Sequence, residues 1–272
     1  MRTYPIFFLL CITCFTISCK RQQPTDTRTV LFDYDDKMLK LMIFNGTLND
    51  SISLNVMFDT GSNERLIVLS DSLTELIDTT ANLQIGIYKF SAPVYAVDRN
   101  NYMFKYFDAI FGWQFFEDKI IEISYQHKYI RELDTMPVPN EFFPIKMKVN
   151  NNISIRIPVK IYAQGKCIEE DFSIDTGFNG DIMLGKYFLD KNKIDLTSAY
   201  LGAAQTVAGS FPGGSILGDS IILGKFTLPD TRISFSTTSI GTQNRLVGNK
   251  VLEHFTVILD LKNFYLYLKP NE

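Results

Sequence analysis

Two short acidic motifs are the residues of this chain best suited to chemistry. The tripeptide Asp-Thr-Gly occurs at Asp59–Gly61 and again at Asp175–Gly177, 116 residues apart (175 − 59 = 116). Each copy ends a run of alternating apolar residues, which predicts a strand buried on one face. Two carboxylates held close together cannot both stay ionised, so they share one proton. Such a pair can take a proton from water and give one to a leaving amine, which is the chemistry of peptide hydrolysis.

The sequence around each motif indicates an internal repeat of two. Each copy is followed by an apolar-apolar-Gly element, then by a short helix-like stretch, and then by a hairpin-like pair of strands. These elements span residues 110–112, 113–117 and 120–130 in the first half, and 246–248, 249–255 and 257–268 in the second. The period is too long for a solenoid, so the repeat predicts two similar lobes.

With these motifs the chain resembles the aspartic proteases of the retropepsin-like and pepsin-like superfamily, in particular two-lobed bacterial members. The resemblance runs from about Met38 to Lys269, although each lobe is too short for a full-length pepsin. It implies a mostly β fold with two tandem pseudo-symmetric acid-protease β-barrel lobes and an interlobe cleft that holds a peptide or protein substrate. It also implies an aspartic-type endopeptidase, a hydrolase in which Asp59 and Asp175 activate water without a cofactor or metal.

The other residues of each tripeptide have expected structural roles. Gly61 and Gly177 allow a sharp turn that places backbone N–H groups against the carboxylates. Thr60 and Thr176 resemble the family's interlocking threonines, whose hydroxyl groups bond across to the opposite loop. These four residues are therefore expected to fix the geometry of the acidic pair.

The surroundings of the two motifs are similar but not identical. By the resemblance, the strands that end at Gly112 and Gly248 cross beneath the two loops. Ser62 could donate a hydrogen bond to Asp59, whereas Phe178 at the matching place cannot donate one. The two carboxylates are therefore expected to lie in unequal environments, and the sequence does not assign the acid and the base.

The second half carries extra residues between its two glycines. That interval is 71 residues (248 − 177 = 71), against 51 in the first half (112 − 61 = 51). The excess contains a glycine-rich segment between strand-like runs at 200–207 and 215–223, which predicts a long hairpin with a glycine-rich tip. In the superfamily such a hairpin, the flap, folds over the bound peptide, and in pepsins the N-terminal lobe supplies it. The candidate flap residues are Gly209, Ser210, Phe211, Gly213 and Gly214, with a plain surface hairpin as the alternative.

Composition and patterning set the domain plan. The chain has 272 residues, 46% of them hydrophobic, and a net charge of −3, which suits a globular protein and gives no sign of a nucleic-acid partner. Alternating apolar runs predict a mostly β chain, and Asn45-Gly46 predicts a tight hairpin turn. The expected units are an N-terminal lobe at 34–133, a proline-containing linker at 134–144 and a C-terminal lobe at 145–272.

The N-terminus has the pattern of a bacterial lipoprotein signal. An apolar stretch ends in Thr16-Ile17-Ser18-Cys19, which resembles the lipobox at which the signal is cleaved before an acylated cysteine. We therefore expect a signal peptide at 1–18, a lipid anchor of the palmitate type on Cys19 and a polar tether at 19–33. This predicts a lipid-anchored membrane protein of the bacterial cell envelope, facing the periplasm or the surface. The alternative is an ordinary secretory signal.

Cysteine usage agrees with that interpretation. Cys11 and Cys14 would leave with the signal and Cys19 would carry lipid, so only Cys167 would stay and no intramolecular disulfide could form. Without ligand-like spacing of Cys and His, a metal site is not expected, and we expect a monomer. The competing function is a non-catalytic peptide- or envelope-ligand-binding lipoprotein on the same scaffold. A purely structural lipoprotein would leave the paired motif unexplained.

Overall fold

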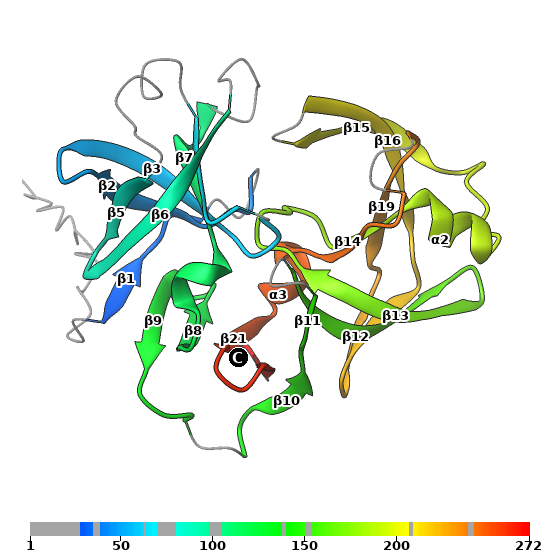
Figure 1. Ribbon diagram of the computed structural model, residues 1–272. Helices are drawn as coiled ribbons and strands as arrows, with labels where there is room; N and C mark the ends of the chain where they lie inside the picture. The colour runs from blue at the N-terminus through cyan, green and yellow to red at the C-terminus, as the bar shows by residue number, and fades with distance from the viewer. Residues whose placement is uncertain are drawn as a thin grey trace, which may run out of the picture.

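The computed structural model describes residues 28–34, 39–62, 64–69, 80–97, 105–137, 140–150, 154–206, 209–238 and 242–272. The predicted signal peptide, Cys19 and most of the predicted tether lie outside the described residues. Within them the chain forms strands arranged in three sheets, with a few short helices (Figure 1). No described helix is long and apolar enough to cross a membrane.

The first lobe is a closed six-stranded barrel in the order β2-β3-β7-β4-β6-β5. Its strands are β2 (Ile43–Leu48), β3 (Ile52–Asp59), β4 (Leu66–Leu69), β5 (Thr80–Ile85), β6 (Tyr88–Val97) and β7 (Ala109–Gly112). The alternating apolar residues point into the barrel, where the rings of Phe58 and Phe111 stack with centroids 4.9 Å apart. The β5–β6 hairpin is part of this wall.

The prediction of a hairpin turn at Asn45-Gly46 was wrong. Both residues lie inside β2, where Asn45 pairs with Asn55 and Gly46 with Leu54. The turn falls at Asn49 and Asp50, both with positive φ angles (49° and 59°).

The second lobe is built on a ten-stranded sheet in the order β15-β16-β19-β14-β20-β13-β12-β17-β18, with β11 paired to β12. Its strands are β11 (Lys148–Asn150), β12 (Ser154–Ala163), β13 (Lys166–Ile174), β14 (Ile182–Leu184), β15 (Tyr200–Thr206), β16 (Gly209–Leu217), β17 (Ser220–Leu223), β18 (Phe226–Pro229), β19 (Arg232–Ser236) and β20 (Arg245–Val247). Helix α2 (Lys186–Lys191) follows β14. Alternation again fixes the faces, because Ile155, Ile157, Val159 and Ile161 of β12 are all buried.

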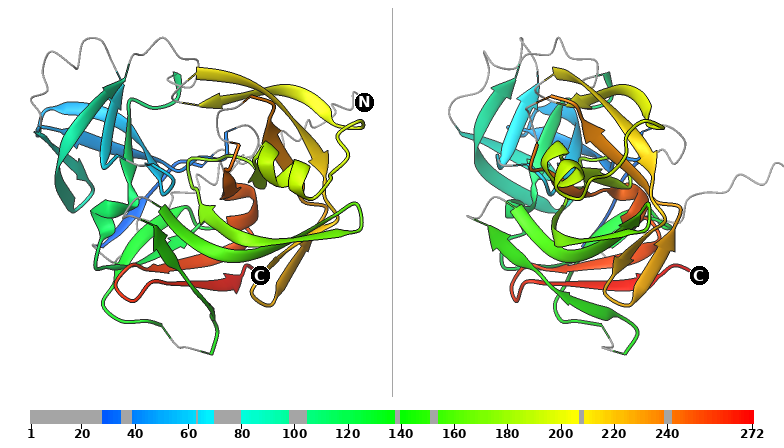
Figure 2. Two further views of the ribbon diagram at one scale, coloured as in Figure 1. Left: turned by 45° about the vertical axis from the view of Figure 1, so that its right-hand side comes forward. Right: turned by 90° about the vertical axis from the view of Figure 1, so that its right-hand side faces the viewer.

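A third sheet takes strands from both halves of the chain. Its order is β1 (Thr29–Leu31), β9 (Tyr129–Leu133), β8 (Ile120–Ser124), β21 (Phe255–Asp260), β22 (Tyr265–Pro270) and β10 (Phe143–Lys146). The antiparallel pair β8–β21 joins the halves. β1 falls inside the expected tether and β10 begins inside the expected linker, so both segments contribute strands to the fold. This shared sheet and the β15–β16 hairpin lie on opposite sides of the molecule (Figures 1 and 2).

The strand pairing around the two motifs is the same in both lobes. β3 runs parallel to β7, and β4 pairs antiparallel with β7 and parallel with β6. In the second lobe β13 runs parallel to β20, and β14 pairs antiparallel with β20 and parallel with β19. This repeated topology confirms the predicted fold class, mostly β with two pseudo-symmetric barrel-like lobes, although the sheet of the second lobe follows an open path.

Candidate active site

The two Asp-Thr-Gly motifs meet where the lobes face each other. Strand β3 ends at Asp59, and β13 ends at Ile174, one residue before Asp175. Both chains then turn in the same way, because the N–H groups of Ser62 and Phe178 bond the main-chain carbonyls of Asp59 and Asp175 at 3.3 and 3.2 Å. Buried apolar strands therefore carry each carboxylate to the contact between the lobes.

The two threonines fasten the loops to each other. The Thr176 hydroxyl accepts a bond from the Thr60 N–H and donates one to the Phe58 carbonyl, at 3.0 and 2.9 Å. In return the Thr60 hydroxyl accepts from the Thr176 N–H and donates to the Ile174 carbonyl, at 3.0 and 2.7 Å. Both threonines are buried, so these four bonds are shielded from water.

Each glycine of the pair of motifs lies against the carboxylate of the other lobe. A Cβ atom added to Gly61 would be 2.6 Å from Cγ of Asp175, and one added to Gly177 would be 2.5 Å from Cγ of Asp59. The side chains could not come this close if either glycine were alanine. Close approach to the opposite acid, rather than a left-handed backbone, is what requires glycine here.

The two carboxyl groups share a hydrogen bond within this frame. Burial raises the pKa of Asp59, while the N–H groups of Gly61, Ser62 and Gly177 and the bond from Asp175 lower it. Burial, the charge of Asp59 and the shared bond raise the pKa of Asp175 well above its usual value. These directions agree with one proton shared by the pair and held mainly on Asp175.

The environments of the two acids differ as expected, but for another reason. The Ser62 hydroxyl does not bond Asp59; it donates to the carbonyl of Glu64 at 2.9 Å. The Gly61 N–H donates to the Asp59 carboxylate at 2.7 Å, whereas the N–H groups of Gly177 and Phe178 lower the pKa of Asp175. The asymmetry therefore does not come from the Ser62 hydroxyl group.

The two apolar-apolar-Gly strands lie directly against these loops. Gly112 ends β7 and pairs with Asp59, and Gly248 follows β20. A Cβ on Gly248 would lie 2.6 Å from the carbonyl oxygen of Phe178, so only glycine allows the strand to pass this close to the second loop. The N–H groups of Gly112 and Gly248 bond the carbonyls of Arg65 and Asp181, which occupy matching positions of the two lobes.

One supporting residue was not expected from the sequence. Asn249, the first residue of helix α3 (Asn249–Leu252), is fully buried. Its amide donates to the carbonyls of Thr176 and Lys40, both at 2.7 Å, and accepts from the Tyr125 hydroxyl at 2.7 Å. Asn249 therefore ties the second acidic loop to both halves of the chain.

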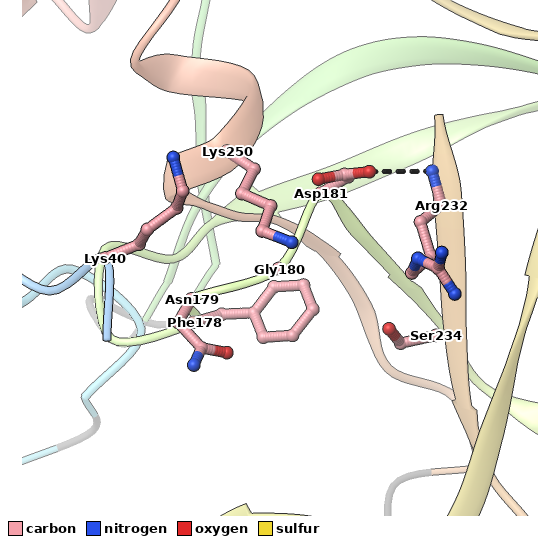
Figure 3. Close-up of a pocket in the computed structure, with 8 residues that line it drawn as sticks. All are labelled: Lys40, Phe178, Asn179, Gly180, Asp181, Arg232, Ser234 and Lys250. Atoms are coloured by element: carbon pink, nitrogen blue, oxygen red, sulfur yellow. Dashed lines mark hydrogen bonds between the residues drawn. The ribbon is translucent and has the colours of Figure 1, made fainter. Parts of the chain in front are cut away.

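A cavity of about 210 Å³ lies beside the second loop (Figure 3). Its wall begins at Phe178, whose N–H reaches the Asp175 carboxyl. The full lining is Lys40, Phe178, Asn179, Gly180, Asp181, Arg232, Ser234 and Lys250. Among the described residues, no cluster of Cys, His, Asp and Glu could hold a metal ion.

The predicted flap hairpin is present, but its tip is not where the sequence placed it. β15 and β16 pair from Tyr200 with Ser215 to Thr206 with Gly209, and residues 207–208 between them lie outside the described residues. The candidate flap residues Gly209, Ser210, Phe211, Gly213 and Gly214 lie in strand β16. The predicted return strand is likewise split, since β16 ends at Leu217 and β17 joins β12.

Glycine is needed inside β16 because neighbouring groups come close. A Cβ on Gly213 would clash with the carbonyl of Phe235 in β19, and one on Gly214 would lie 2.8 Å from the Phe235 ring. Figure 1 shows the hairpin extending from the second lobe toward the first. The described part of the first lobe has no matching hairpin, because β4 is followed there by the barrel strands β5 and β6.

No protein-family model and no curated protein matches the chain. Among solved structures, one match is a retropepsin-like aspartic protease from Rickettsia conorii, 23% identical in sequence, with a TM-score of 0.37. The match covers 47% of this chain and 91% of that chain.

Proposed function

We propose that the chain is an aspartic-type endopeptidase that hydrolyses peptide bonds with a water molecule activated by Asp59 and Asp175. The observation that carries this proposal is the close approach of two half-buried carboxyl groups, each against the glycine of the opposite loop, in loops that bond each other through both threonines. A structural turn needs neither a second carboxylate nor the crossed threonine bonds. General acid–base hydrolysis needs both a base and an acid, held close together.

The unequal surroundings of the acids suggest a role for each. Asp59, whose carboxylate accepts the Gly61 N–H at 2.7 Å, is the ionised member and accepts a proton from the attacking water. Asp175 holds the proton and donates a hydrogen bond to the scissile carbonyl, which becomes negatively charged as water adds. The proton taken by Asp59 then passes to the leaving amine, so the pair ends with the one proton with which it began.

The substrate would be a peptide lying between the lobes, with the β15–β16 hairpin acting as the flap. Support comes from the direction of this hairpin and from its place in the lobe that carries Asp175. A flap on the second lobe would close over the peptide from the side opposite to that used in pepsins. Closure would exclude water and strengthen the electrostatic interactions at the pair.

A digest of a peptide library by the purified full-length protein tests hydrolysis. We expect cleavage by the wild type, an optimum below neutral pH and inhibition by a hydroxyl-containing transition-state mimic. Asp59→Asn and Asp175→Asn should each abolish cleavage, and the double variant should lose little more, because the pair acts as one unit. Circular dichroism should show all three variants folded.

Two results would count against this function. Cleavage that persists in Asp175→Asn would place the chemistry elsewhere. A folded wild type that binds peptides but cleaves none across the pH range would favour the second candidate, a non-catalytic binding lipoprotein.

The proposed location is the bacterial cell envelope, with the chain anchored through lipid on Cys19. The support is the sequence pattern around Cys19. Mass spectrometry of the native N-terminus should find an acylated Cys19. An unmodified N-terminus at another residue would remove the anchor from the proposal.

A further inference from the structure

The cavity beside the second acidic loop carries more positive than negative charge. Its charged lining residues are Lys40, Arg232, Lys250 and Asp181. Lys40 is neutralised by Glu253 of α3's C-terminal end, 2.5 Å away. The remaining charged lining residues are two cations, Arg232 and Lys250, and one anion, Asp181, so the cavity has an excess of one positive charge. One bound carboxylate would balance it.

Neither remaining cation has an acidic partner among the residues that the structure describes. The Arg232 guanidinium donates to the Ser215 hydroxyl at 3.0 Å, which leaves its charge uncompensated. The Asp181 carboxylate accepts the main-chain N–H of Arg232 at 2.7 Å, so it orients the start of β19. The Lys250 amine extends into the cavity on the side of Asp181 and Gly180 (Figure 3). It forms no ion pair with an acidic side chain among the described residues.

The pseudo-symmetry of the lobes shows that this cationic lining is specific to one side of the acidic pair. Gly112 and Gly248 occupy matching positions, so Gln114, two residues after Gly112, takes the place of Lys250. Val94 pairs with Leu66 as Ile233 pairs with Ile182, so Pro93, the residue before Val94, takes the place of Arg232. Both replacements are uncharged. Arg65, which matches Asp181, is a cation, but it forms an ion pair with Glu117 at 3.7 Å.

The matching space in the first lobe is also filled. Gln114 is buried, and its Oε1 atom occupies the place that a Cβ of Gly112 would need. In the second lobe the Lys250 side chain instead leaves an open cavity. A peptide has a direction, so a charged cavity on only one side of the pair would select a residue on only one side of the cleaved bond.

We propose that this cavity is a specificity site that takes one carboxylate of a peptide substrate, an aspartate or glutamate side chain near the bond to be cut. The inference rests on the proposed hydrolysis, because it names the substrate class of the same site. Two cationic heads in one cavity can bind both oxygens of a carboxylate. The volume of about 210 Å³ is below the roughly 300–1,000 Å³ of pockets for whole drug-sized ligands, and it suits a single side chain.

The site joins the acidic pair through one short segment of chain. Phe178 contacts the Asp175 carboxyl through its N–H, and Gly180 and Asp181 continue the same loop into the cavity wall. Lys40 comes from the first half of the chain, so the cavity lies between the lobes. A peptide that crosses the pair can therefore place a neighbouring side chain here without leaving the interface.

Binding can be measured separately from cleavage with the full-length Asp175→Asn protein. The probes are pairs of synthetic octapeptide pools with blocked ends, one pair for each fixed position. That position holds glutamate in one pool and glutamine in the other, and the remaining positions are randomised without acidic residues. A third pool with a free C-terminus and no acidic residue tests whether a terminal carboxylate is taken instead. Mass spectrometry identifies the peptides retained by the immobilised protein.

We expect at least one glutamate pool to be retained about tenfold better than its glutamine counterpart at low salt. High salt should reduce the preference, because the cations are partly exposed. Lys250→Gln and Arg232→Gln should each weaken the preference and the double variant should abolish it. Lys89→Gln, an exposed lysine of the first-lobe barrel, should leave it unchanged.

The outcomes separate this inference from the proposed hydrolysis. Equal retention of glutamate and glutamine pools, no retention of any pool, or a preference that survives in the double variant would overturn the inference. Retention of only the free C-terminus pool would replace the side chain by a terminal carboxylate and refute the proposal as stated. Cleavage by the wild type without acidic preference would leave hydrolysis standing alone. Acidic preference without cleavage would support the site and refute hydrolysis.

Discussion

Replacing Thr176 with alanine tests whether the crossed threonine bonds hold the two acidic loops together. The change removes the hydroxyl that accepts from the Thr60 N–H and donates to the Phe58 carbonyl, at 3.0 and 2.9 Å. It leaves the backbone of the second loop unchanged. The perturbation is therefore confined to two bonds between the halves of the chain.

The magnitude follows from the number of bonds and their burial. A buried hydrogen bond contributes about 1 kcal/mol, and leaving its partner unsatisfied raises the loss to about 1–3 kcal/mol. Two such losses give about 2–6 kcal/mol for Thr176→Ala. That is a large part of the roughly 5–15 kcal/mol by which a domain is stable. Since a displacement of 1 Å at a reacting group can lower a rate about 100-fold, hydrolysis should fall by a similar factor.

Urea unfolding followed by tryptophan fluorescence measures the loss of stability, because Trp113 is buried. Thr176→Ser keeps the hydroxyl and should lose about 1 kcal/mol or less. Thr227→Ala, an exposed threonine of β18, should change stability by less than about 0.5 kcal/mol. If Thr176→Ala unfolds at the same urea concentration as Thr176→Ser, the crossed bonds do not stabilise the interface.

Three further changes probe the same site. Asp175 has a pKa raised above its unfolded value, so the stability it contributes is complete at acidic pH and is lost as pH rises through the folded pKa. Asp175→Asn should then be more stable than the wild type at pH 7 and show no such advantage near pH 4. Chemical denaturation at both pH values measures this difference, and a variant less stable than the wild type at pH 7 would contradict it. Asn249→Ala removes three buried bonds and should lower stability by about 2–4 kcal/mol, and an unchanged melting temperature would show that Asn249 does not brace the loop. Gly177→Ala places a Cβ 2.5 Å from the Asp59 carboxyl carbon and should lower both stability and hydrolysis, whereas Gly202→Ala, with no atom within 4 Å, should leave stability unchanged in thermal melts.

The features that were predictable from the sequence are those with a local signal repeated in both halves. Alternating apolar residues before Asp59 and Asp175 correspond to β3 and β13, and the doubled glycine elements correspond to β7 and β20. The contacts across the interface could not be read in this way. Asn249 and Lys40 are 209 residues apart, so no local pattern announces their bond.

Two errors show tertiary structure overriding a strong local signal. Asn45-Gly46 has the composition of a hairpin turn, yet the pairing of β2 with β3 extends the strand to Leu48. The glycines of β16 suggested a turn, yet they are required where strand β19 passes close by. In both places glycine allows neighbouring groups to come close. Glycine is also common in turns, so its presence alone does not predict a turn.

Residues 29–31 of the expected tether form β1, which no local pattern indicated. β1 has three residues and its partners, Tyr129–Arg131, lie about a hundred positions later in the chain. A strand this short has no periodicity of its own to detect. Only the neighbouring strand β9 makes residues 29–31 part of a sheet.

The shared sheet has a consequence for the order in which the protein is made and folded. Its central contact pairs Ser124 of β8 with Thr256 of β21, a separation of 132 residues (256 − 124 = 132). Contacts so distant in sequence form late in folding, and β21 and β22 leave the ribosome only after both Asp-Thr-Gly motifs. A chain that ended before residue 255 would therefore keep both Asp-Thr-Gly motifs but lose β21 and β22, and with them the sheet that the two halves share.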